Sequence, residues 1–141
     1  MEQKNRLVWV SRFLIGLVLF FNVQCALVFL ISPAAFTPGF ELQGAVGDAM
    51  VRAMGILFLM WNVPYGLAVI QPVRWRISLY EAVAMQAIGL LGETLLLVTF
   101  PTGHTAVRQT VTRFILLDGA GLIFLLFALL LTIRLPSRSA A

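Results

Sequence analysis

The chain has 141 residues, of which 60% are hydrophobic and only 11% are charged, and its formal net charge is +4. A soluble domain of this length could not bury so much apolar surface, so the composition excludes a small water-soluble protein and predicts one whose solvent is the lipid bilayer. The small excess of basic residues indicates anionic lipid as the charged partner and gives no reason to expect a nucleic-acid ligand.

Four apolar runs separated by polar connections account for most of the chain. They predict four membrane spans, at about residues 7–32, 49–70, 77–100 and 112–134. At 1.5 Å rise per residue, each is long enough to cross a hydrocarbon core of about 30 Å. In hydrocarbon each backbone amide needs a partner within its own segment, and the runs do not alternate as barrel strands do. We therefore expect one all-α transmembrane domain, residues 1–141, folded as a four-helix bundle.

The orientation of the bundle is predicted from the basic residues at the ends of the spans. The side that holds both termini and the second loop carries seven of them: Lys4, Arg6, Arg12, Arg74, Arg76, Arg134 and Arg138. The long loop at residues 32–47, on the other side, carries none. The positive-inside rule then predicts a multi-pass protein of the cell membrane with both termini in the cytoplasm.

The first span carries two amide side chains, Asn22 and Gln24. They differ in direction by about 200° on a helix of 3.6 residues per turn, so they cannot both face the same neighbour. A polar amide without a partner is costly in hydrocarbon, and either residue could instead bond a local backbone carbonyl. We expect at least one of them to contact another polypeptide, as a second subunit or a second copy of this chain.

Two expectations concern the second span and the loop that precedes it. Asp48 is a candidate N-cap for this span. Pro64 is expected to kink the span in its middle or inner half, because proline removes one helical hydrogen bond. The loop itself, rich in proline and glycine, is expected either to lie on the outer surface or to fold back as a lid.

Charged and polar residues inside the spans are the main functional candidates. Arg52, Glu93 and Asp118 lie on three different spans at similar predicted depth, and Gln86 and Asn62 extend this polar cluster. One interpretation is a structural salt-bridge network that fixes the helix register. The other is a polar pocket beneath the 32–47 loop that binds an amphiphilic ligand.

The sequence also excludes several kinds of chemistry. No predicted span contains a histidine, so the chain cannot supply the two axial histidines of a membrane haem. It has one cysteine, hence no Cys-x-x-Cys motif, and no His, Cys and carboxylate grouping with zinc spacing. We therefore predict no metal site, no cofactor and no catalytic residue within this chain.

The segment Arg12-Phe-Leu-Ile-Gly16, opening a four-span chain of this size, resembles the first helix of the DoxX-like bacterial membrane proteins. The resemblance covers the topology and this Arg-x-x-x-Gly motif. It implies a four-helix membrane fold and a loose link to quinone-level redox chemistry as a small subunit. The second span, with Arg52-Ala-Met-Gly55, departs from the acidic, glycine-paired pattern of that family, so no residue is assigned a catalytic role by the resemblance.

Three functions are consistent with these features. The first is a non-enzymatic accessory or scaffolding subunit of a larger membrane complex, which fits the small size and the short loops. The second is a lipophile-binding protein, or a membrane enzyme acting on a quinone or lipid, that uses the Arg52, Glu93 and Asp118 cluster. The third is a small proton-coupled carrier, which ranks last because its first span has no carboxylate.

Overall fold

A computed structural model describes residues 2–135, and all its regular elements in that range are helices. The main helices are α1 (Glu2–Ile31), α2 (Gly44–Trp61), α3 (Val63–Ile70), α4 (Arg76–Thr99) and α5 (Thr105–Ile133). Because α2 and α3 follow one another, they form one span, and four segments are long and apolar enough to cross a membrane. This confirms the all-α, four-helix bundle of a multi-pass membrane protein. Arg138, one of the residues behind the predicted orientation, lies outside the described residues.

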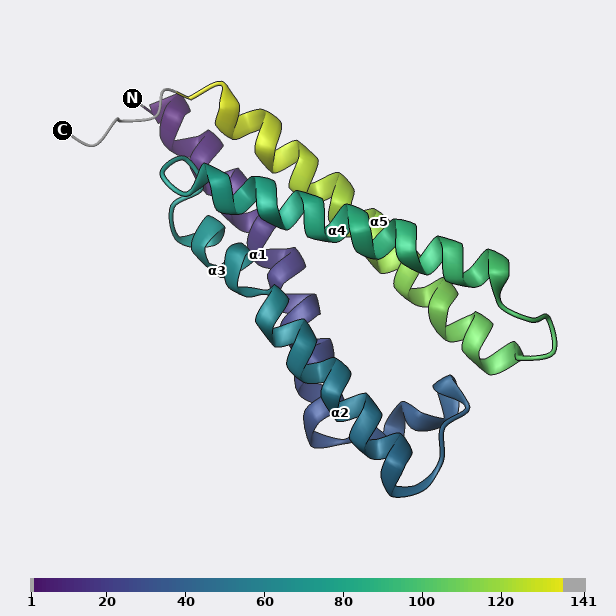
Figure 1. Cartoon of the computed structure of the whole chain (residues 1–141). Helices are drawn as coiled ribbons and strands as arrows, with labels where there is room; N and C mark the ends of the chain where they lie inside the picture. The colour runs from purple at the N-terminus through teal and green to yellow at the C-terminus, as the bar shows by residue number, and fades with distance from the viewer. Residues whose placement is uncertain (1, 136–141) are drawn as a thin grey trace.

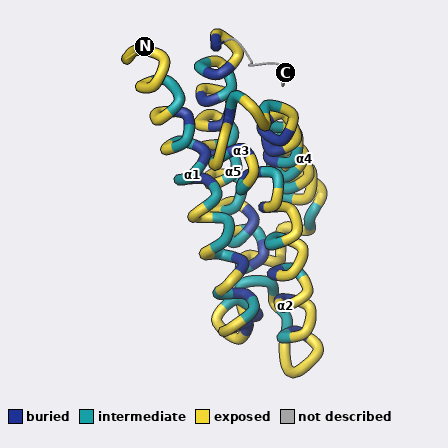
Figure 2. Tube along the Cα trace, turned by 90° about the vertical axis from the view of Figure 1, so that its left-hand side faces the viewer, coloured by how far each residue is buried: buried dark blue, intermediate teal, exposed yellow. Residues whose placement is uncertain are grey.

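The bundle consists of two helix pairs that come together at one end and diverge toward the other (Figure 1). Helix α1 packs on α2, α3 and α5, while α4 packs on α5 and α3. Fully buried Ile15, Leu79 and Leu125 form the centre of the core, together with small Ala82 and Ala128. Exposed residues lie along the outer faces of the helices (Figure 2), and many of them are large and apolar, as a lipid-facing surface requires.

Helix α5 is longer than its apolar run predicts, since it begins at Thr105 and not at residue 112. Its polar first turns remain helical because Val107 and Val111 are buried against the rest of the bundle. Asp118 therefore lies about 20 Å along the helix from Thr105, near its middle.

The predicted interruption of the second span is confirmed. The helix breaks at Asn62, two residues before Pro64, and divides into α2 and α3. At the break the Asn62 side-chain Nδ2 donates at 2.6 Å to the Phe58 carbonyl, which also accepts the Asn62 backbone N–H. The predicted N-cap is wrong, because α2 already begins at Gly44 and Gln43 holds the cap position, so Asp48 lies inside the helix.

Three arginines bind the carbonyl ends of neighbouring helices. Arg12 donates to Val69 O at 3.0 Å, near the end of α3. Arg76 donates to Thr132 O and Leu135 O, at 2.7 and 2.8 Å, at the end of α5. Arg108 donates to Leu97 O and Phe100 O, at 2.8 and 3.0 Å, at the end of α4. The last carbonyls of a helix have no partner within it and carry its negative dipole, so these contacts stabilise the helix ends.

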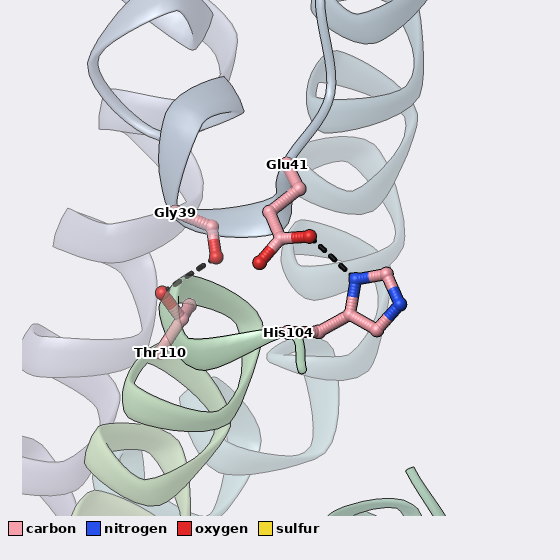
Figure 3. Close-up of polar contacts among 4 residues, drawn as sticks. All are labelled: Gly39, Glu41, His104 and Thr110. Atoms are coloured by element: carbon pink, nitrogen blue, oxygen red, sulfur yellow. Dashed lines mark hydrogen bonds and ion pairs between the residues drawn. The ribbon is translucent and has the colours of Figure 1, made fainter. Parts of the chain in front are cut away.

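The loop at residues 32–43, here called the lid loop, folds back across the bundle onto α5. It contains the short helices η1 (Pro33–Ala35) and η2 (Thr37–Phe40). Thr110 Oγ1 donates to Gly39 O at 2.8 Å, and His104 Nδ1 lies 2.6 Å from Glu41 Oε2 (Figure 3). Of the two predicted arrangements, the structure has the loop folded back as a lid.

Candidate functional site

A line of side-chain hydrogen bonds crosses the middle of the bundle from α3 through α4 to α5. The Tyr65 hydroxyl lies 2.6 Å from Gln86 Oε1, and Gln86 Nε2 donates to Asp118 Oδ1 at 2.9 Å. Tyr65 and Gln86 are 3% and 4% exposed, so both are withdrawn from the surrounding medium. Gln86 Oε1 accepts a hydrogen bond from the Tyr65 hydroxyl while Nε2 donates to Asp118, so the amide fixes the position of Asp118 as an acceptor.

Two glycines provide the space for these polar side chains. A Cβ atom added at Gly121 would lie 2.7 Å from Gln86 Nε2, and one added at Gly89 would collide with Asp118 Oδ2. Real Cβ atoms do not approach polar atoms so closely, so any larger residue at either position displaces the amide or the acid. The two small residues are therefore part of the site, although they carry no functional group.

The hydrogen-bonded line forms one wall of a cavity of about 190 Å³ between the helices. The cavity is partly open, and all five main helices or their junctions contribute to it. Its polar lining residues are Asn22, Cys25, Asn62, Tyr65, Gln86, Glu93 and Asp118. The rest of the wall is apolar, with Phe21, Phe58, Trp61, Phe114 and Phe124 as its rings.

Two buried oxygen atoms at this cavity have no hydrogen-bond partner: Asn62 Oδ1 and Glu93 Oε2. Asn62 is only 7% exposed, so water or lipid headgroups do not reach most of its surface. Buried polar atoms are nearly always paired in folded proteins, and an unpaired one is costly. Both atoms are acceptors, so each would be satisfied by a hydrogen-bond donor, either a water molecule or a group of a ligand.

A cluster of phenylalanines separates the cavity from the lid loop. Phe29 lies at its centre, with ring centroids 4.5 Å from Phe36, 5.6 Å from Phe58 and 6.2 Å from Phe114. Phe36 belongs to the lid loop, and Phe58 and Phe114 belong to the cavity wall. The lid loop is thus packed against the same rings that line the cavity, and its position affects that end of the site.

The structure brings Glu93, Asp118, Gln86 and Asn62 together at the cavity, as the sequence suggested, but not Arg52. Arg52 is exposed and is absent from the cavity wall. Within residues 2–135 the one ion pair joins Glu41 and His104. The buried positions of α2 are Gly47, Val51 and Gly55, and Gly55 lies against Ala26 of α1, whereas Arg52 is exposed beside this face.

The two amides of α1 face in different directions, as their spacing requires. Asn22 lines the cavity, whereas Gln24 is exposed and lines an outer groove on α1 that also includes Gly16 and Val69. Sequence reasoning did not assign Tyr65 or Cys25 to the site. Tyr65 could have been found from its position three residues after Asn62, which places both side chains on one helix face.

Comparisons with protein families, with curated proteins and with solved structures find no match for this chain. In the part of the chain that the structure describes, no group of three His, Cys, Asp or Glu residues is arranged to hold a metal ion.

Proposed function

We propose that this protein binds an amphiphilic molecule taken from the surrounding bilayer, in the cavity between its helices. The observation that carries this proposal is the pair of unpartnered oxygens, Asn62 Oδ1 and Glu93 Oε2, at a cavity with otherwise apolar walls. Ligand sites are mostly apolar with a few convergent polar groups, and ionisable residues inside a membrane bundle favour a functional interpretation.

The size of the cavity limits which part of a ligand it holds. An apolar cavity of about 150 Å³ is known to accommodate a benzene molecule. The present cavity of about 190 Å³ therefore suits a head group of roughly one ring or a short branched group. Wall residues Phe21, Trp61 and Leu117 are 48%, 47% and 54% exposed, so the apolar remainder of the ligand has a path toward lipid.

Native mass spectrometry of the protein released from lipid nanodiscs tests this function. We expect a small amphiphile to remain bound in a one-to-one ratio. Cys25→Phe, which fills the cavity, should remove that mass. Val98→Phe on α4 should retain it, because Val98 is 77% exposed and does not line the cavity. A wild-type protein that carries only nonspecific bilayer lipid, in the same amount as Cys25→Phe, would contradict the proposal.

We also propose that the membrane is the cell membrane and that both termini lie in the cytoplasm. The basic residues near the start of α1 and between α3 and α4 support this orientation, because cytoplasmic flanks carry an excess of Lys and Arg. The lid loop and the loop between α4 and α5 then lie on the outer side. The cavity is reached from the membrane interior or from the outer half of the bilayer.

A second candidate function is an accessory subunit of a membrane complex, and it rests on a different observation. Gln24 is an exposed amide on the outer face of α1, in a groove of about 710 Å³ lined by α1 and α3. Small residues and interhelical amide bonds are typical of helix contacts in membranes, and Gly16 lies in the same groove. The two functions are compatible, since one uses the interior and the other the surface of the bundle.

A further inference from the structure

We propose that the head group of the bound amphiphile is a cation, an amine that lies between Glu93 and Asp118. This inference rests on the proposed binding function and names the chemical class of its ligand. It follows from three properties of the cavity wall: which hydrogen-bonding groups are free, what charge the wall carries, and which rings surround it.

The buried polar atoms at the cavity that have no hydrogen-bond partner are both acceptors. Asn62 uses its Nδ2 to bond Phe58 O and Gln86 uses its Nε2 to bond Asp118, so neither amide N–H₂ group is left without an acceptor. The unpartnered buried atoms are Asn62 Oδ1 and Glu93 Oε2, whereas the Asn22 amide, which also lines the cavity, is only half-buried. An ammonium group has several N–H donors and no acceptor, which complements this wall. A carbonyl or ether head group would add a further acceptor and pair with neither oxygen.

The charge of the wall points the same way. Glu93 and Asp118 both line the cavity, and among its lining residues there is no Lys, Arg or His. The one arginine expected at this depth, Arg52, is exposed and does not line the cavity. An ionised carboxylate away from water is costly unless a cation or several donors accompany it. A ligand ammonium supplies that missing charge, whereas an anionic head group such as a phosphate would add to the repulsion.

The rings of the wall suit a cation as well. Phe58, Trp61, Phe114 and Phe124 all line the same cavity as the two acids. The face of an aromatic ring attracts a nearby ammonium group, and the attraction increases when the site is desolvated. The carboxyl oxygens and the rings therefore act on the same part of the ligand.

The two acids differ in their hydrogen bonds: Asp118 accepts one from Gln86, whereas one oxygen of Glu93 accepts none. Asp118 is held by Gln86, which is in turn held by Tyr65, so its orientation is fixed before a ligand arrives. Glu93 has an oxygen with no partner, and this makes it the primary counter-ion. The other titratable groups that line the cavity are Cys25 and Tyr65, and neither carries a positive charge.

A matched pair of probes tests the inference with the full chain in nanodiscs. The probes are 4-octylbenzylamine and 4-octylbenzyl alcohol, which share a ring and a tail and differ in the charge of the head group. Binding is measured by native mass spectrometry at equal membrane concentrations, with lipid-only nanodiscs correcting for partitioning. We expect saturable one-to-one binding of the amine, at least about tenfold tighter than that of the alcohol, as a charge-assisted hydrogen bond requires.

The variant Glu93→Gln should lower the affinity for the amine about tenfold and leave that for the alcohol nearly unchanged. Glu81→Gln is the matched control, because Glu81 is an exposed acid on the same helix that does not line the cavity. If Glu93→Gln does not fold, the difference between the affinities of the wild-type protein for the amine and for the alcohol still tests whether the ligand is a cation. Equal affinity for both probes would overturn the cationic ligand and keep the binding function, whereas no saturable binding of either would overturn both.

Discussion

Gln86 Nε2 donates to Asp118 Oδ1 at 2.9 Å and thereby joins the middle of α4 to the middle of α5. The contact is possible because the helices are glycine-lined where they meet, at Gly89 and Gly121. Close approach of two helices in a membrane usually depends on such small residues. Here they also leave room for a polar pair that would otherwise be displaced.

The first prediction compares two glycines on α4. Gly89→Ala should destabilise the bundle by about 1–3 kcal/mol, because the new methyl group collides with Asp118 Oδ2 and breaks its bond to Gln86. Gly92→Ala is the control, since a Cβ there meets nothing within 4 Å and alanine favours the helix. Unfolding in mixed micelles with increasing denaturing detergent measures both. Equal stability of the two variants would show that the contact is unimportant.

A second prediction concerns the end of α4. Arg108→Met should lower the free energy of unfolding by about 1–2 kcal/mol, because two carbonyls, Leu97 O and Phe100 O, lose a charged donor. The control is Arg113→Met. Arg113 is exposed and lies, like Arg108, on α5, so this variant should change the free energy of unfolding by less than about 0.5 kcal/mol. The same micelle titration distinguishes them, and a larger loss from Arg113→Met would be inconsistent with this role of Arg108.

A third prediction concerns the pH dependence of the lid loop. The hydrogen bond from His104 lowers the pKa of Glu41 below its ordinary value of 4.5. A carboxyl whose pKa is lowered in the folded state stabilises that state above its ordinary pKa, and the contribution is lost as the pH falls through the lower value. Hydrogen exchange of lid-loop amides, corrected for intrinsic rates, should therefore accelerate below pH 4.5.

In Glu41→Gln this acceleration should be absent, because the amide does not titrate. Thr110 still donates to Gly39 in that variant, so the lid loop keeps one of its contacts with α5. Identical pH profiles for the wild type and Glu41→Gln would reject the role of this pair.

A fourth prediction tests the orientation in the membrane. In a Cys25→Ser background, Gln43→Cys in the lid loop and Lys4→Cys at the start of α1 should react with an impermeant maleimide from opposite sides. In whole cells only Gln43→Cys should be labelled, and Lys4→Cys should react after the membrane is opened. Ser137, an alternative position near the C-terminus, lies outside the described residues. Labelling of both from the outside would contradict cytoplasmic termini.

The fifth prediction tests the accessory-subunit function. Cysteines placed along α1 should crosslink to a neighbouring chain with a period of about 3.6 residues, centred on the face of Gln24. Asn22 lines the internal cavity, so cysteines on its face should not crosslink. Crosslinking in native membranes before extraction is the measurement. A protein that stays folded in nanodiscs and crosslinks on neither face would favour a self-contained binding protein.

The sequence was sufficient for the architecture and for part of the site. The length of the apolar runs predicts four helices, because a backbone that crosses the bilayer must satisfy its hydrogen bonds within its own segment. Pro64 correctly marks the break in the second span. The stripe of Gln86 and Glu93 also lines the cavity as expected. These features depend only on the spacing of residues within a single helix, and that spacing can be read from the sequence.

The relation between helices was harder to predict. Arg52 matches the acids in approximate depth, but depth does not fix how α2 is rotated about its own axis. Packing fixes that rotation: Val51 and Gly55 are buried, with Gly55 close to Ala26 of α1, and Arg52 is left exposed. The donors and acceptors of Tyr65, Gln86 and Asp118 became clear only once three helices were placed together.

The arginine contacts at the helix ends have a consequence for biosynthesis. Arg12 is made early, yet its acceptor, Val69, is synthesised 57 residues later; Arg76 likewise precedes Thr132 by 56 residues. Arg108, in contrast, finds Leu97 and Phe100 already made. A nascent chain that extends past Arg76 but not yet to Thr132 therefore contains both Arg12 and Val69, whereas Arg76 still lacks its acceptor. The assembly of the bundle is complete only when the last turn of α5 has emerged.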